Sequence, residues 1–182
     1  MSAERWVAVG AVSPADGAGA VWERLRGLPE GVGVAFEDPG EGVHPLALAA
    51  GVLLDRPERP VVVPLVCRDR NRAALLAEAR GAEALGCRGL LLLTGRLGDP
   101  GDAPVYFLDP LVLARELRRA GVGLELWATG RLSTPAQRAR ARVLAEAGVT
   151  RWILPAGEEA VAVEGLRILR HGAEIEPLEA GP

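Results

Sequence analysis

The sequence contains no lysine, and all 21 of its basic residues are arginine. This absence excludes a Schiff-base or other catalytic lysine, and it excludes the phosphate-binding P-loop, whose motif requires one. Aromatic residues are also scarce, at 4% of the chain, and the formal net charge is only -3. Such a chain has neither a continuous basic face for a nucleic acid backbone nor a platform on which bases stack. We therefore expect no nucleic acid partner.

Long hydrophobic runs are missing as well. The segment MSAERWVAVG lacks a run of signal-peptide length, and the longest apolar runs are the size of a strand, so no membrane span is expected. These features predict a cytoplasmic protein. Cys67 and Cys87 show no CxxC spacing, which favours free thiols with structural roles. The two histidines, His44 and His171, are too scattered to predict a metal site.

Short apolar runs alternate with segments of helical periodicity along most of the chain. Strands are expected at 6–12, 33–36, 61–67, 89–94, 123–128 and 151–154, and helices at 19–27, 45–54, 72–85, 110–120 and 135–147. The strands lack polar alternation, as expected when both faces of a parallel sheet are buried. This order predicts an α/β fold, wound open or curled into a TIM-like (β/α) barrel of about six parallel strands.

The pattern changes after residue 155. Apolar and polar residues alternate on both sides of His171-Gly172, which predicts a β-hairpin or a pair of edge strands, with His171 as a turn residue. We predict a single domain over residues 1–182, with the barrel at 5–155 and a carboxyl-terminal extension at 156–182. A barrel truncated in this way needs the hairpin or a partner subunit to cover its edges.

In parallel α/β folds, ligands bind beyond the carboxyl ends of the strands. The loops expected there carry four arginines, which predict a pocket for a small anion: Arg68, Arg70, Arg96 and Arg131. The same loops hold several aspartates, so solvated ion pairs are an equal alternative. A pair of carboxylates such as Glu37 with Asp99 is also open. Neither histidine has an evident acidic neighbour for a Ser-His-acid site.

The segment from Val63 to Gly95, VPLVCRDRNRAALLAEARGAEALGCRGLLLLTG, resembles methylenetetrahydrofolate reductase in its CRDRN run, its ALG helix end and its TG strand end. The likeness extends from Arg5 to Pro155. It implies a TIM-like barrel of one-carbon metabolism that binds a flavin, FAD or FMN, and passes hydride from NAD(P)H to methylenetetrahydrofolate. Flavin contacts are then implied at Thr94, Gly95, Tyr106, Asp69 and Asn71.

Several polar positions of that family are occupied here by residues that cannot perform acid/base chemistry. Gly10, Pro64 and Leu144 stand in place of a glutamate, a histidine and a lysine, and Arg96 replaces an aspartate beside the flavin. We assign no catalytic residue and favour a binding protein or pseudoenzyme of folate metabolism with an anionic, folate- or flavin-like ligand. The alternatives are an active flavin-dependent oxidoreductase and a non-catalytic subunit that forms a homo-oligomer or binds a reductase partner.

Overall fold

The computed structural model describes residues 5–10, 18–38, 42–68, 70–95, 108–171 and 174–177. The helices are α1 (Ala18–Arg26), α2 (Pro45–Asp55), α3 (Arg72–Leu85), α4 (Pro110–Arg119) and α5 (Pro135–Glu146). The strands are β1 (Arg5–Val9), β2 (Val32–Phe36), β3 (Val61–Val66), β4 (Gly89–Leu93), β5 (Glu125–Thr129), β6 (Val149–Leu154), β7 (Arg167–Arg170) and β8 (Glu174–Pro177). No helix in the described part of the chain is long and apolar enough to cross a membrane.

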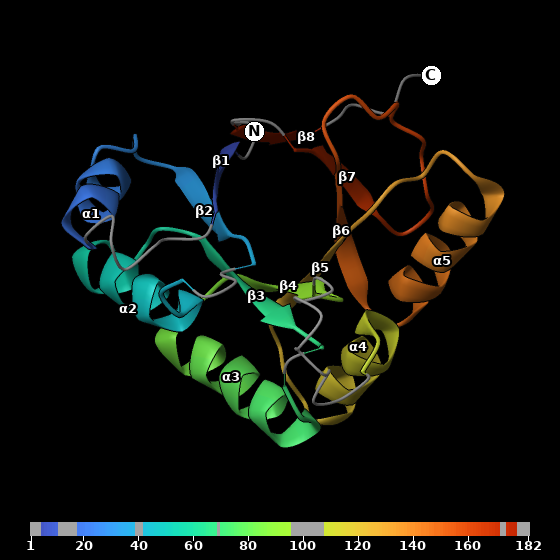
Figure 1. The fold of residues 1–182 in the computed structure, drawn as a ribbon, viewed down its shortest axis with the longest axis horizontal. Coiled ribbons are helices and arrows are strands. Elements are labelled where there is room, and N and C mark those ends of the chain that lie inside the picture. Colours follow the sequence, from blue (N-terminus) through green and yellow to red (C-terminus); the bar gives the residue numbers. More distant parts are fainter. Residues whose placement is uncertain are drawn as a thin grey trace, which may run out of the picture.

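The strands form one closed barrel in sequence order (Figure 1). β1 to β7 are parallel to one another, and β8 runs antiparallel to both β7 and β1. The five helices lie outside the strands, as Figure 1 shows. The predicted TIM-like α/β fold is therefore confirmed, with seven parallel strands where the sequence indicated about six.

The region after residue 155 closes the barrel. β7 adds to β6 in parallel, with Trp152 opposite Ile168. β8 then turns back and pairs with β1, where Ile175 lies opposite Trp6. The expected hairpin thus supplies the last parallel strand and the closing strand, so the sheet keeps no open edge. The connection between β6 and β7, residues 155–166, is described throughout and contains no helix.

Side chains and a glycine at the helix ends determine where α3, α4 and α5 begin and where α3 ends. Asn71, Asp109 and Thr134 each accept a hydrogen bond from a backbone N–H in the first turn of α3, α4 and α5. Gln137 completes a capping box with Thr134. Gly86 ends α3 with a φ of 82°, a conformation that glycine adopts without strain. These caps lie in the connections of the barrel.

The core has two layers. The larger layer packs the outer face of the strands against the helices. The smaller fills the barrel interior and consists of Trp6, Ala35, Val62, Leu91, Trp127, Ile153 and Leu169. Trp6 and Trp127 meet edge to face with ring centroids 4.7 Å apart. The packed side chains of this smaller layer fill the space between the amino end and the carboxyl end of the barrel.

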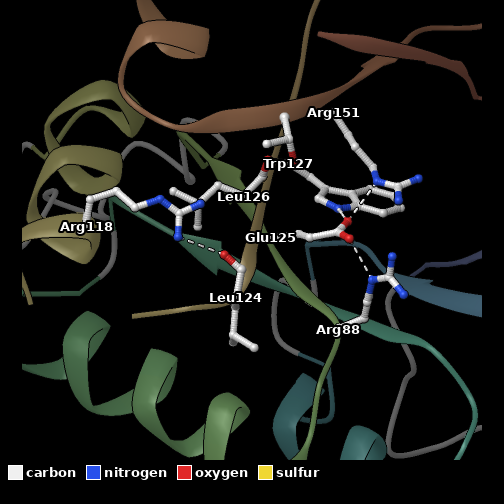
Figure 2. A network of polar contacts seen from close by, with 8 residues as sticks. Arg88, Arg118, Leu124, Glu125, Leu126, Trp127 and Arg151 are labelled. Atoms are coloured by element: carbon white, nitrogen blue, oxygen red, sulfur yellow. Dashed lines mark hydrogen bonds and ion pairs between the residues drawn. The ribbon is translucent and has the colours of Figure 1, made fainter. Parts of the chain in front are cut away.

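Charged side chains fill the amino end of the barrel (Figure 2). The Glu125 carboxylate accepts hydrogen bonds from Arg88 at 2.6 Å, from Arg151 at 2.8 Å and from the indole of Trp127 at 3.2 Å. The Arg151 guanidinium also lies 5.0 Å from the centroid of the Trp127 ring. A carboxylate and a guanidinium are therefore held together inside the barrel, where an unpaired charge would be strongly unfavourable.

Candidate functional site

The opposite end of the barrel, where the parallel strands finish, carries side chains from distant parts of the chain. We call this end the mouth. Glu37 directly follows β2, and His171 directly follows β7. Arg68 lies two residues beyond β3, and Thr94 follows β4. Because the carboxyl ends of parallel strands converge, these residues face a common region that in barrels of this type holds the ligand.

Glu37 and His171 contact each other at the mouth, through Oε1 of the carboxylate and Nε2 of the imidazole. We call them the mouth pair. Hydrogen bonds fix both backbones: the Glu37 N–H donates to the carbonyl of Val9 at 2.9 Å, and the His171 N–H donates to that of Leu154 at 2.8 Å. The two side chains are 39% and 38% exposed, so a small molecule in the mouth can reach them.

Gly10 leaves room for the mouth pair. A Cβ atom at this position would lie 3.5 Å from Oε2 of Glu37, an ordinary contact distance. An alanine would therefore fit, whereas a longer side chain would occupy the space beside the carboxylate. The small residue at the end of β1 allows Glu37 to reach across to the hairpin.

A pocket of about 930 Å³ lies over the ends of β3, β4 and β5. We call it the rim pocket. Asp38, the residue after Glu37, is one of its walls, so the pocket reaches the end of β2, whereas Glu37 and His171 themselves do not line it. The volume is within the range of small-molecule sites. Its lining combines apolar with polar side chains: Asp38, Arg68, Leu92, Leu93, Thr94, Gly95, Leu108, Asp109, Pro110, Ala128, Thr129, Arg140 and Leu144.

The two arginines of the rim pocket differ in their electrostatic surroundings. Arg140 forms an ion pair with Asp109 at 2.8 Å, and Asp109 also caps α4. Arg68 is half-buried, and the described residues provide it with neither a hydrogen-bond acceptor nor an ion-pair partner. A guanidinium in this position carries a positive charge that the described protein does not neutralise.

Gly95 determines how closely β4 approaches Arg68. Its φ is +93°, and a Cβ atom there would lie 2.8 Å from Cγ1 of Val66 and 3.0 Å from Cβ of Arg68. Both the backbone conformation and the contact distance therefore require glycine. Thr94 and Gly95 line the rim pocket.

Other residues that the sequence singled out have partners within the protein. Asn71 caps α3 through Oδ1, which accepts from the Ala74 N–H at 2.9 Å. Arg70 pairs with Glu78 at 2.8 Å, and Arg131 pairs with Glu158 at 3.3 Å. None of the three lines the rim pocket. The remaining candidates, together with Asp99, lie outside the described residues: Asp69, Arg96 and Tyr106.

The mouth pair was not found from the sequence. His171 was interpreted as a turn residue without an acidic neighbour, and Glu37 was considered only as a partner for Asp99. His171 does lie between β7 and β8, but its side chain turns to Glu37, 134 positions away. The missing information was the direction of β7, because a parallel β7 places His171 at the mouth. Among the described residues, no cluster of three or more His, Cys, Asp or Glu side chains could hold a metal ion.

Both cysteines are free and buried, and burial governs their chemistry. Burial, reinforced by the charge of Asp109, raises the pKa of Cys67 to about 12, and burial raises the pKa of Cys87 to about 11. At pH 8, on the order of one Cys67 in ten thousand is thiolate, the reactive form. We expect Ellman's reagent to label neither thiol quickly in the folded protein and both after denaturation. Rapid stoichiometric labelling of native protein would contradict this assignment.

No protein-family model matches the chain, and no curated protein matches its sequence. Its structure is similar to that of 2,3-dimethylmalate lyase, described as a member of the PEP mutase/isocitrate lyase superfamily. The match has a TM-score of 0.52 and covers 91% of this chain and 74% of the lyase chain, with 12% sequence identity. At this identity the similarity establishes the barrel fold and does not extend to the reaction.

These comparisons overturn the resemblance to methylenetetrahydrofolate reductase and the folate and flavin-reductase functions derived from it. The structure suggests why the motif misled. Asn71 of the CRDRN run caps α3, Gly86 of ALG ends the same helix in a left-handed conformation, and Gly95 of TG permits a close approach. Any barrel with these turns favours such residues. Binding of FAD or FMN is not tested by these findings and stays a prediction.

Proposed function

We propose that the rim pocket binds a small anionic molecule through a carboxylate or phosphate group. The observation that carries this proposal is Arg68, a half-buried guanidinium in a pocket of about 930 Å³ with no ion partner among the described residues. An anion would supply the missing partner, and its two oxygens suit the paired N–H donors of a guanidinium.

The other walls of the rim pocket support a small organic anion. Leu93 and Leu108 offer apolar contact to a carbon skeleton, and the Thr94 hydroxyl can donate a hydrogen bond to an anionic oxygen. The structurally similar lyase is named for 2,3-dimethylmalate, which is itself a small carboxylate. A cytoplasmic location and a homo-oligomeric state stay predictions.

Replacing Arg68 by alanine is expected to weaken binding of malate, succinate or inorganic phosphate by about 1.5 to 3 kcal/mol, or roughly 10- to 100-fold, the range of a charged hydrogen bond. Isothermal titration calorimetry with each anion measures the change. Arg142→Ala is the matched control, because Arg142 is an exposed arginine of α5 that does not line the pocket. Equal affinities for the wild type and Arg68→Ala would contradict the proposal.

A further inference from the structure

We infer that the mouth pair, Glu37 and His171, is a general acid–base site that transfers a proton to and from an O–H group at the mouth. The group belongs to water or to the anionic molecule held at Arg68, so the inference rests on the proposed anion pocket. His171 is the catalytic residue, and Glu37 is a positioning residue that acts through it.

The position of the pair supports this role. Only β8 and β1 stand between β7 and β2 in the closed barrel, and the ends of β2 and β7 bring a carboxylate and an imidazole together at the mouth. Both side chains are more than a third exposed. The rim pocket begins at Asp38, one residue beyond Glu37. Arg68 follows β3 at the same end of the barrel, so a molecule anchored there and extended across the mouth meets the imidazole.

The contact between the two side chains determines which imidazole nitrogen is available. Nε2 of His171 faces the Glu37 carboxylate, so a proton on Nε2 is favoured in the neutral ring. Nδ1 then carries the lone pair, and the described residues donate no hydrogen bond to it. A carboxylate that fixes the tautomer and orientation of a histidine is the arrangement of acid–histidine catalytic sites.

The proton transfer balances without another reactant. In the hydrolysis of an ester, Nδ1 accepts a proton from water as the water oxygen bonds to the ester carbonyl carbon. The imidazolium then returns this proton to the leaving oxygen as the bond between that oxygen and the acyl carbon breaks. The products are a carboxylic acid and an alcohol, and the neutral ring is restored. Proton transfer to and from a positioned side chain of this kind contributes about 10²- to 10⁴-fold to a rate.

The plainer interpretation is that the pair only ties the hairpin to β2. A half-exposed ion pair stabilises a fold by about 1 kcal/mol or less, so this interpretation predicts a small change in stability and no change in reactivity. The two interpretations are therefore separated by a rate measurement on folded variants.

The experiment uses mono-4-nitrophenyl terephthalate, an activated ester whose ring keeps its free carboxylate away from the ester carbonyl, and follows release of 4-nitrophenolate by its absorbance. We expect saturable hydrolysis by the wild-type protein and a kcat at least about 100-fold lower in His171→Gln. Glu37→Gln should lower kcat by about tenfold with little change in KM, and Glu37→Asp should recover part of the loss. His44→Gln is the matched control, since the His44 imidazole accepts a hydrogen bond from the Leu46 N–H and does not line the rim pocket.

The outcomes separate this inference from the anion pocket. Hydrolysis that is absent in the wild type, or equal in folded His171→Gln and His171→Asn checked by circular dichroism, overturns the acid–base site. If calorimetry in that case still shows anion binding that depends on Arg68, the proposed anion pocket is retained and only the acid–base site is wrong. If hydrolysis depends on His171 but 4-nitrophenyl acetate, which lacks the carboxylate, reacts equally well, the acid–base site stands and the anion pocket is wrong.

Discussion

Replacing Glu125 by alanine is expected to lower the free energy of unfolding by about 3 kcal/mol, the lower end of the range for breaking a buried ion pair. The Arg151 side chain is only 7% exposed and donates to Glu125 at 2.8 Å, while the buried Trp127 indole donates to the same carboxylate (Figure 2). Removing the carboxylate leaves a buried cation and an N–H donor without this acceptor. Urea unfolding followed by tryptophan fluorescence measures the difference.

Glu23→Ala is the control for this prediction. Glu23 is 79% exposed and pairs with Arg26 at 3.5 Å, a surface ion pair worth at most about 1 kcal/mol. Glu125→Gln should fall between the two, because glutamine keeps a hydrogen-bond acceptor and loses the charge. Similar stabilities for Glu125→Ala and Glu23→Ala would mean that the amino end of the barrel does not depend on the carboxylate.

The contribution of Glu125 should also disappear in acid. Burial alone would raise the pKa of Glu125, but hydrogen bonds from Arg88, Arg151 and the Trp127 indole, together with the charge of Arg151, outweigh burial and hold the pKa below its usual value of 4.5. A lowered pKa in the folded state stabilises the fold above the unfolded value, and this contribution is lost as the pH falls through the folded value. The stability gap between the wild type and Glu125→Gln should therefore be constant above about pH 5.5 and shrink below about pH 4.5.

The fold was predictable because its signals are local. Thr134-Pro135 marks the start of α5 and Gly86 marks the end of α3. The strands are uniformly apolar, which predicts that other parts of the protein bury both faces of the sheet. Such patterns reflect hydrogen bonds and burial within a few residues of each position. The short alternating segment after residue 155 was compatible with a hairpin or with edge strands, so its place in the barrel depended on contacts with β6 and β1 that the local pattern does not encode.

The candidate site was predictable only in part for the same reason. Arg68, Thr94 and Gly95 follow strands, so the topology alone places them at the mouth. Arg70 also follows β3 and looked equivalent to Arg68 in the sequence. In the structure, however, Arg70 forms an ion pair with Glu78 of α3. The contact between Glu37 and His171 requires the closed barrel, because it joins the second strand to the seventh. Long-range pairing therefore decides which charges are available to a ligand.

Gly33→Ala is expected to destabilise the barrel by about 2 to 3 kcal/mol, within the range for overpacking a filled core. A Cβ atom at Gly33 would lie 2.4 to 2.7 Å from three atoms of the Trp6 ring. Trp6 is 1% exposed and packs edge to face against Trp127, so the ring has no free space into which it can move. The substitution therefore forces the interior aromatic pair or the backbone of β2 to shift, and urea unfolding measures the effect.

Two further variants test this cause. In Gly51→Ala the new Cβ would lie 2.0 Å from the Trp22 ring, but Trp22 is only half-buried on α1 and can turn outward. Alanine also favours the helix by about 1 kcal/mol over glycine, so little net loss is expected. Trp6→Phe shortens the clashing ring and gives up no hydrogen bond, since the described structure provides no acceptor for the Trp6 N–H. The double variant Gly33→Ala/Trp6→Phe should therefore lose less free energy of unfolding than the two single variants lose together. If the two losses simply add, the destabilisation by Gly33→Ala comes from the backbone of β2 and not from the clash with the ring.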